Sequence, residues 1–125
     1  MARLVDLDNR LQKSVPSIRV YKERCVLNES ACSLLGLSEQ KPKVFVRQDG
    51  EQAMNGRDRI YIGRSDKEIG YEVKMRGRSG RINSAHLSRQ LSQHLSGYGV
   101  YRICKEVKIE DGLTTYYEIF FRRYS

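Results

Sequence analysis

Three arginines stand close together in the segment R-G-R-S-G-R, which runs from Arg76 to Arg81. A guanidinium group can bind a phosphate through two parallel hydrogen bonds. The two glycines between the arginines let the backbone bend close to a ligand. We interpret the segment as a turn between a strand and a helix N-terminus, where unpaired N–H groups attract anions. The segment therefore predicts a phosphate-binding site.

Basic residues continue on both sides of this segment. No acidic residue stands between Val73 and Lys105, whereas this stretch holds seven basic residues. Asn83 and Ser84 follow the arginines and offer hydrogen bonds of the kind that fix a protein on a phosphate backbone or contact base edges. The stretch as a whole therefore indicates a nucleic-acid-binding surface.

The composition of the whole chain agrees with a polyanionic partner. The chain has 125 residues, 23 Lys and Arg against 15 Asp and Glu, and a formal net charge of +8. A small basic protein of this kind is expected to bind nucleic acid or another polyanion. The length allows one compact domain, or two very small ones that share a core. It excludes a kinase, an α/β barrel and a two-domain dinucleotide-binding enzyme.

Catalytic and metal-binding patterns are not found in the sequence. His86 and His94 are eight positions apart and have no neighbouring carboxylate to orient either as a base. Cys25, Cys32 and Cys104 form no C-x-x-C pair, so neither a disulfide framework nor a closed zinc site is expected. The sequence therefore predicts no enzyme activity, no catalytic residue, no metal and no cofactor.

Two further features bear on localisation. No stretch approaches the roughly 20 apolar residues that span a bilayer. The N-terminal residues lack the basic start and the apolar run of a signal peptide. We therefore expect a cytoplasmic protein that does not contact membranes.

An internal similarity organises the chain. An offset of 55 positions places Ile18 on Val73 and Tyr61 on Tyr116, and both halves show the same predicted order of elements. In the first half we expect strands at Ser17–Tyr21, Lys43–Arg47 and Arg59–Ile62, and a helix capped by Asn28 and ended by Gly36. In the second half we expect a strand at Tyr71–Arg76, a turn at Gly77–Gly80, a helix capped by Asn83 with the stripe Leu87, Leu91 and Leu95, and a hairpin of Tyr101–Ile109 and Leu113–Arg122.

This order predicts the fold class and the domain boundaries. We expect an α+β, β-rich fold in which two β-α-β-β repeats pack as one pseudo-symmetric domain, because a single unit is too small to bury a core. The boundaries are an N-terminal leader at residues 1–16, a first repeat at 17–63, a linker at 64–70 and a second repeat at 71–125.

The stretch from Arg24 to Leu37, R-C-V-L-N-E-S-A-C-S-L-L-G-L, resembles the signature of the AbrB-type swapped-hairpin family of transcription regulators. Two such units in one chain resemble the tandem, MraZ-like arrangement of that family. The resemblance implies interlocked hairpins, swapped within or between chains, and a basic surface made by loops and helix starts. It also implies DNA binding in transcription regulation. Cys32 and Ser33 stand where the family has basic residues. Glu23 and Glu29 also weaken the positive potential at the turn of the first repeat. We therefore expect the second repeat to make most of the contacts with DNA.

We therefore expect a regulator that binds double-stranded DNA, with a homodimer or a higher homo-oligomer as a possible state. The candidate nucleic-acid-binding residues are Lys74, Arg76, Arg78, Arg81, Arg89, Asn83, Ser84, Arg24 and Lys22. Two alternatives stay open at this point. One is a module for RNA or single strands that stacks bases on the aromatic residues Tyr101, Tyr116, Tyr117, Phe120 and Phe121. The other is an antitoxin-like adaptor whose basic surface meets an acidic protein.

Overall fold

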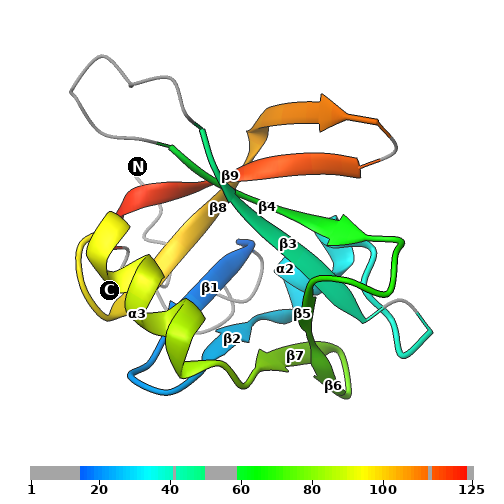
Figure 1. Cartoon of the computed structure of the whole chain (residues 1–125), viewed down its shortest axis with the longest axis horizontal. Helices are drawn as coiled ribbons and strands as arrows, with labels where there is room; N and C mark the ends of the chain where they lie inside the picture. The colour runs from blue at the N-terminus through cyan, green and yellow to red at the C-terminus, as the bar shows by residue number, and fades with distance from the viewer. Residues whose placement is uncertain (1–14, 41, 50–58, 113, 124–125) are drawn as a thin grey trace, which may run out of the picture.

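The computed structural model describes residues 15–40, 42–49, 59–112 and 114–123. In this part of the chain, nine strands form one antiparallel sheet that curls into a nearly closed barrel with two short helices (Figure 1). The strands are β1 Ser17–Val20, β2 Cys25–Leu27, β3 Lys43–Gln48, β4 Ile60–Ser65, β5 Tyr71–Glu72, β6 Lys74–Arg76, β7 Ser79–Ile82, β8 Gly99–Asp111 and β9 Thr114–Arg123. The helices are α2 Glu29–Leu35 and α3 Ala85–His94, and the sheet order is β5-β3-β4-β9-β8-β1-β2-β7-β6.

The predicted fold of two packed β-α-β-β swapped-hairpin repeats is wrong, because the structure is a single barrel. Strands from the two halves of the chain neighbour each other at four places in the sheet: β3 pairs with β5, β4 with β9, β8 with β1, and β2 with β7. Neither half therefore has a sheet of its own. One of these pairings, β2 with β7, is formed by two short segments that were not predicted as strands, Cys25–Leu27 and Ser79–Ile82.

The offset of 55 positions reappears in the register of the barrel. Val26 pairs with Arg81 where β2 meets β7, and Ile62 pairs with Tyr117 where β4 meets β9. In both pairs the second residue lies 55 positions after the first. Equivalent positions of the two halves are therefore paired with each other inside one barrel, and the internal similarity does not divide the barrel into two units.

Both ends of α2 were predicted correctly, whereas the N-cap of α3 was placed one residue too early. The side chain of Asn28 accepts a hydrogen bond from Ala31 N at 2.9 Å, and Gly36 ends the helix with a φ of 69°. At α3 the cap is Ser84 and not Asn83, since the Ser84 hydroxyl accepts a hydrogen bond from Leu87 N at 3.1 Å. A serine oxygen serves the first helical turn as well as an asparagine oxygen does.

Strand boundaries differ from the predicted ones by a few residues, and one predicted strand is divided in two. The expected strand Tyr71–Arg76 is broken at Val73, whose N–H leaves the ladder and donates to Pro42 O at 2.6 Å. The predicted C-terminal hairpin is present as β8 and β9. The expected start of its second strand, Leu113, lies outside the described residues, as does most of the predicted leader at residues 1–16.

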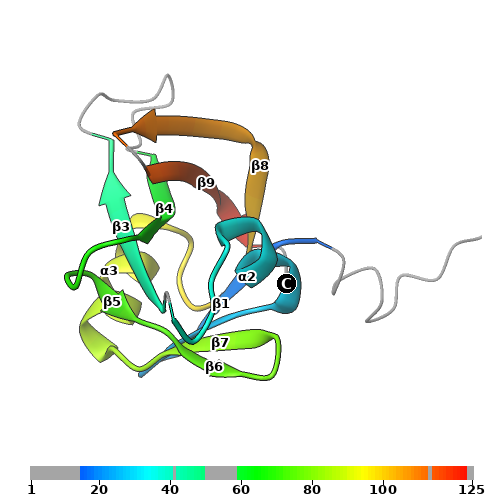
Figure 2. The ribbon, with the colours of Figure 1, turned by 90° about the vertical axis from the view of Figure 1, so that its right-hand side faces the viewer.

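The core lies inside the barrel, and both helices pack on the inner face of the sheet. The stripe Leu87, Leu91 and Leu95 of α3 is buried, as predicted. The Ser88 hydroxyl of α3 lies 3.3 Å from Cys25 Sγ on β2, and both side chains are fully buried. Figure 2 shows α2 above the β6–β7 hairpin, on the inner side of the sheet.

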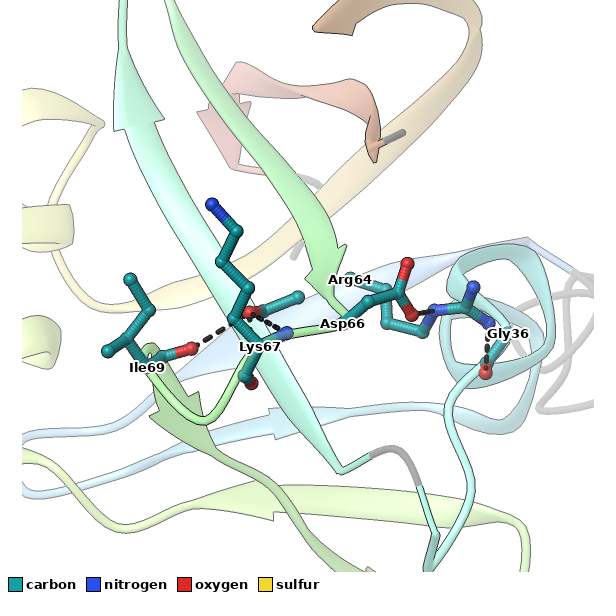
Figure 3. A network of polar contacts seen from close by, with 6 residues as sticks. Gly36, Arg64, Asp66, Lys67 and Ile69 are labelled. Atoms are coloured by element: carbon teal, nitrogen blue, oxygen red, sulfur yellow. Dashed lines mark hydrogen bonds and ion pairs between the residues drawn. The ribbon is translucent and has the colours of Figure 1, made fainter. Parts of the chain in front are cut away.

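A polar network ties the end of α2 to the end of β4 (Figure 3). Arg64 donates from Nη1 to Gly36 O at 3.1 Å and forms an ion pair with Asp66 through Nε at 3.2 Å. The buried Ser65 hydroxyl donates to Ile69 O at 2.8 Å and accepts from Lys67 N at 3.1 Å. The first part of the predicted linker 64–70 is therefore the end of a strand followed by a tightly bonded turn.

The three cysteines are free and buried. Burial raises the pKa of the Cys32 thiol from 9.0 to about 11, because the thiolate would lose its hydration. Burial also raises the pKa values of Cys25, Cys104 and Tyr101.

These raised pKa values predict a loss of stability at alkaline pH. The unfolded chain releases the Cys32 proton near pH 9, whereas the folded chain holds it until about pH 11. The stabilising effect is therefore complete below pH 9 and falls between pH 9 and 11. Urea unfolding at pH 8 and pH 10.5 measures the loss. The variant Cys32→Ala should show a smaller drop between the two values, and an unchanged drop would contradict the assignment.

Candidate nucleic-acid interface

The outward side of β1, β2, β7 and β6 carries a row of basic side chains. The register places Arg19, Val26, Arg81 and Lys74 beside one another on consecutive strands. Their neighbours along the strands, such as Ile18 and Ile82, are buried in the core. Because side chains alternate between the two faces of a sheet, the row must point away from the core.

Further cations extend this row. Arg76 lies two positions after Lys74 on β6 and is exposed, and Arg102 lies opposite Ser17 on β8 with its side chain in solvent. The strand segments β1, β2, β6 and β7 contain no acidic residue. We call this surface the basic face; its cations are Arg19, Arg24, Lys74, Arg76, Arg81 and Arg102. At about 4.8 Å between strands, the five strands that carry it span about 19 Å.

Tyr21 positions two of these arginines. Its hydroxyl accepts a hydrogen bond from Arg19 Nη1 at 3.2 Å. The guanidinium carbon of Arg24 lies 4.7 Å from the centre of the Tyr21 ring, and that of Arg19 lies 5.8 Å from it. Guanidinium groups held on an aromatic ring lose less freedom when they bind an anion than free ones do.

Arg81 is the most enclosed cation of the basic face. Its Nε atom is buried and, among the described side chains, has no hydrogen-bond partner. An unsatisfied buried donor on a charged group costs free energy. Its neighbour across the ladder is Lys74, so the two cations face the same space above the sheet.

The β6–β7 hairpin is held in place by contact at Gly80. A Cβ atom at this position would lie 2.4 Å from Val73 Cγ1 and 3.2 Å from Cys32 Sγ. The absence of a side chain therefore lets β7 approach α2 and the inner layer closely. Gly77 opens the two-residue turn with a φ of 62°, and the Ser79 hydroxyl donates to Arg76 O at 3.1 Å.

The structure brings together only part of the predicted site. Lys74, Arg76, Arg81 and Arg24 lie on the basic face. Arg78 lies at the tip of the hairpin and is paired with Glu29 at 3.1 Å, although both side chains are exposed. This pair stands at a cleft of about 550 Å³ between α2 and the hairpin, on the other side of the sheet from Arg81.

The remaining predicted residues lie outside the row of paired strands that carries the basic face. Arg89 is exposed on α3, a helix that packs against the inner face of β2 through Ser88. The hydroxyl of Ser84 is occupied as the cap of that helix, and Asn83 precedes it in solvent. Lys22 lies in the β1–β2 turn beside Glu23. The predicted anion site at a helix N-terminus is therefore not part of this surface.

Sequence reasoning missed Arg19, Tyr21 and Val26. The signal was present for Arg19, because it stands between the apolar residues Ile18 and Val20 in an alternating strand and must therefore point outward. The position of Val26 opposite Arg81 depends on the pairing of β2 with β7, which no local pattern predicts.

The C-terminal aromatic residues do not form a row of free rings. Tyr101 and Tyr116 are buried. Phe120 and Phe121 contact each other edge to face at 5.2 Å, and the guanidinium groups of Arg102 and Arg122 lie over their rings at 5.6 Å. The Arg102–Phe120 contact joins β8 to β9, whereas the other two contacts join neighbours along β9.

In the described ranges, no group of three or more His, Cys, Asp or Glu side chains is placed to hold a metal ion. No helix among them is both long and apolar enough to cross a membrane. The chain matches no family model, no curated protein and no solved structure.

The contact at Gly80 predicts a large effect of a small substitution. Gly80→Ala should lower the free energy of unfolding by about 1–3 kcal/mol, because the added methyl group meets Val73 in a filled space. Urea unfolding measures the change. The control is Ser79→Ala on the outward side of the same strand, which removes only the exposed hydrogen bond from its hydroxyl to Arg76 O. Equal losses in the two variants would show that Gly80 is not required for packing.

Proposed function

We propose that this chain is a DNA-binding protein whose basic face lies against the backbone of duplex DNA. The observation that carries the proposal is the outward row Arg19, Arg81 and Lys74, joined by Arg76, on strand segments that contain no acidic residue. Lys and Arg side chains that neutralise phosphates supply most of the affinity of sequence-independent DNA binding. A role in transcription regulation and the formation of oligomers stay predictions of the sequence.

The extent of the basic face favours a polymer over a small anion. Neighbouring cations are separated by about 5 Å across paired strands and by about 7 Å along one strand. One phosphate could occupy only one part of a surface about 19 Å wide. A nucleic-acid backbone presents a phosphate every few Å and can occupy all of it.

The covered ring of Tyr21 favours a duplex over a single strand. Proteins that bind single strands offer aromatic faces on which bases stack. On the basic face, the guanidinium groups of Arg24 and Arg19 already lie at the Tyr21 ring. Backbone contact, which a duplex provides, needs no free ring.

The salt dependence of binding tests this proposal. Fluorescence anisotropy with a labelled duplex at several salt concentrations should give a log K that falls linearly with log salt, with a slope of about −0.9 for each neutralised phosphate. The double variant Lys74→Ala/Arg81→Ala should reduce the magnitude of the slope by about 2 and lower affinity at least tenfold at low salt.

The matched control removes two positive charges elsewhere. Lys67 and Lys108 are exposed on the β4–β5 turn and on the projecting β8–β9 hairpin, away from the basic face (Figure 1). The variant Lys67→Ala/Lys108→Ala should retain most of the affinity. Equal losses in both double variants would mean that net charge, and not the basic face, governs binding. Tighter binding of single strands or of an acidic protein would support the alternative functions.

Glu29 is expected to oppose DNA binding at the hairpin tip. Its ion pair with Arg78 is exposed on both sides and contributes little to stability. Glu29→Gln should therefore leave the unfolding free energy almost unchanged, release Arg78, and raise affinity for duplex DNA about two- to fivefold at low salt. The same substitution in an Arg78→Ala background should have a smaller effect. An equal rise in both backgrounds would exclude the ion pair as the cause.

A further inference from the structure

The β6–β7 hairpin forms a margin of the described sheet. β6 pairs with β7 and has no further strand beside it in the sheet order. The chain leaves the neighbouring β5 at Val73, and β7 pairs with β2 only over Gly80–Ile82, so the two strands extend beyond β2 as a short ribbon around Arg76 and Ser79. A ribbon at a margin can enter a groove that would exclude the middle of a sheet.

The two sides of this ribbon have different chemistry. The inner side consists of Met75 and Gly80 and packs against Val73 and Cys32. The outer side consists of Lys74, Arg76, Ser79 and Arg81, which are all hydrogen-bond donors. Because the inner side is fixed by the contact at Gly80, the outer side is presented on rigid strands and not on a mobile loop.

The width of the ribbon fits one groove of B-form DNA. Two strands with their side chains fit the major groove, which is about 12 Å wide, whereas the minor groove of about 6 Å is too narrow. The neighbouring strand β2 carries the small Val26 between Arg81 and Arg19. With the ribbon in the groove, one phosphate backbone would pass over Val26, between the cations of Arg81 and Arg19.

Arg76 is the arginine best placed to reach the bases. It lies on the marginal strand β6, opposite the small Ser79, and its carbonyl is held by the Ser79 hydroxyl. Within the described residues no ion pair involves it, in contrast to Arg78. In the major groove, guanine presents O6 and N7, two acceptors that match the two donors of an arginine.

We propose that the β6–β7 hairpin enters the major groove and that Arg76 binds the O6 and N7 atoms of guanine. This inference rests on the proposed function and extends it from backbone contact to sequence recognition. Arg76 is then the specificity-determining residue, while Lys74, Arg81 and Arg19 bind the phosphates on either side of the groove.

Base analogues test the inference with the full chain. Four duplexes of equal length are compared at one salt concentration: one rich in G·C pairs, the same duplex with inosine or with 7-deazaguanine in place of guanine, and one of A·T pairs. Inosine keeps O6 and N7 and lacks only the minor-groove amino group, whereas 7-deazaguanine lacks N7. The wild-type chain should bind the G·C and inosine duplexes equally and the other two about tenfold more weakly.

The variants separate base contact from phosphate contact. Arg76→Ala should lower affinity for the G·C duplex about tenfold, to the level of the A·T duplex, and change A·T binding less than threefold. Lys74→Ala, the control, should weaken binding to all four duplexes equally and reduce the magnitude of the salt slope by about 0.9. Circular dichroism confirms that each variant is folded.

Three outcomes would overturn the inference while leaving the proposed function intact. The first is equal affinity of the wild-type chain for all four duplexes. The second is an affinity for the inosine duplex as low as that for the A·T duplex. The third is an Arg76→Ala variant that loses the same affinity for every duplex. If the wild-type chain bound no duplex at low salt, the proposed function itself would fail.

Discussion

Burial of the inner side of β1, β2, β7 and β6 is the constraint on which the candidate site depends. Two short helices lie on that side, α2 against Gly80 and α3 against Cys25 through Ser88. A strand whose alternate side chains are packed in this way cannot rotate or slip by one residue without exposing its core positions. The outward positions are therefore held in place, and a row such as Arg19, Arg81 and Lys74 becomes a fixed arrangement of charge.

The environment of the arginines distinguishes this surface from the rest of the barrel. Elsewhere, Arg59 pairs with Glu118 at 3.5 Å and Arg64 pairs with Asp66 at 3.2 Å. On the basic face, the described contacts of the Arg19 and Arg24 guanidinium groups are with Tyr21 and not with a carboxylate. The Nε atom of Arg81 has no partner among the described residues. Cations that have already found a carboxylate gain less from a phosphate than cations that have not. The difference favours the basic face as the binding surface.

Local signals in the sequence predicted the elements but not their arrangement. The helix between Asn28 and Gly36 follows from a cap and a stop only a few residues apart, and the β8–β9 hairpin follows from two apolar strands around one turn. Strand β7 was missed because its residues Ser79 and Gly80 are typical of turns, and it is a strand because β2 supplies its partner. Such pairings join residues more than 50 positions apart, which no local propensity encodes.

The same limit explains what was predicted of the site. The acid-free run between Val73 and Lys105 includes Lys74, Arg76 and Arg81, which the structure places on one hairpin. It could not show that Arg89 belongs to a helix on the other face of the sheet.

The two hairpins at the centre of the basic face share a register but differ in chemistry. At the offset of 55 positions, Lys74 corresponds to Arg19, so a cation stands at each end of the row. The positions that correspond to Arg76 and Arg81, however, are Tyr21 and Val26. Equivalent backbone therefore carries two arginines in β6–β7 and two uncharged residues in β1–β2. Under the proposed function, an internal similarity that preserves the strands and changes these two positions would give the hairpins different roles. The β6–β7 hairpin would bind the DNA directly, and the β1–β2 hairpin would support it with the cations of Arg19 and Arg24.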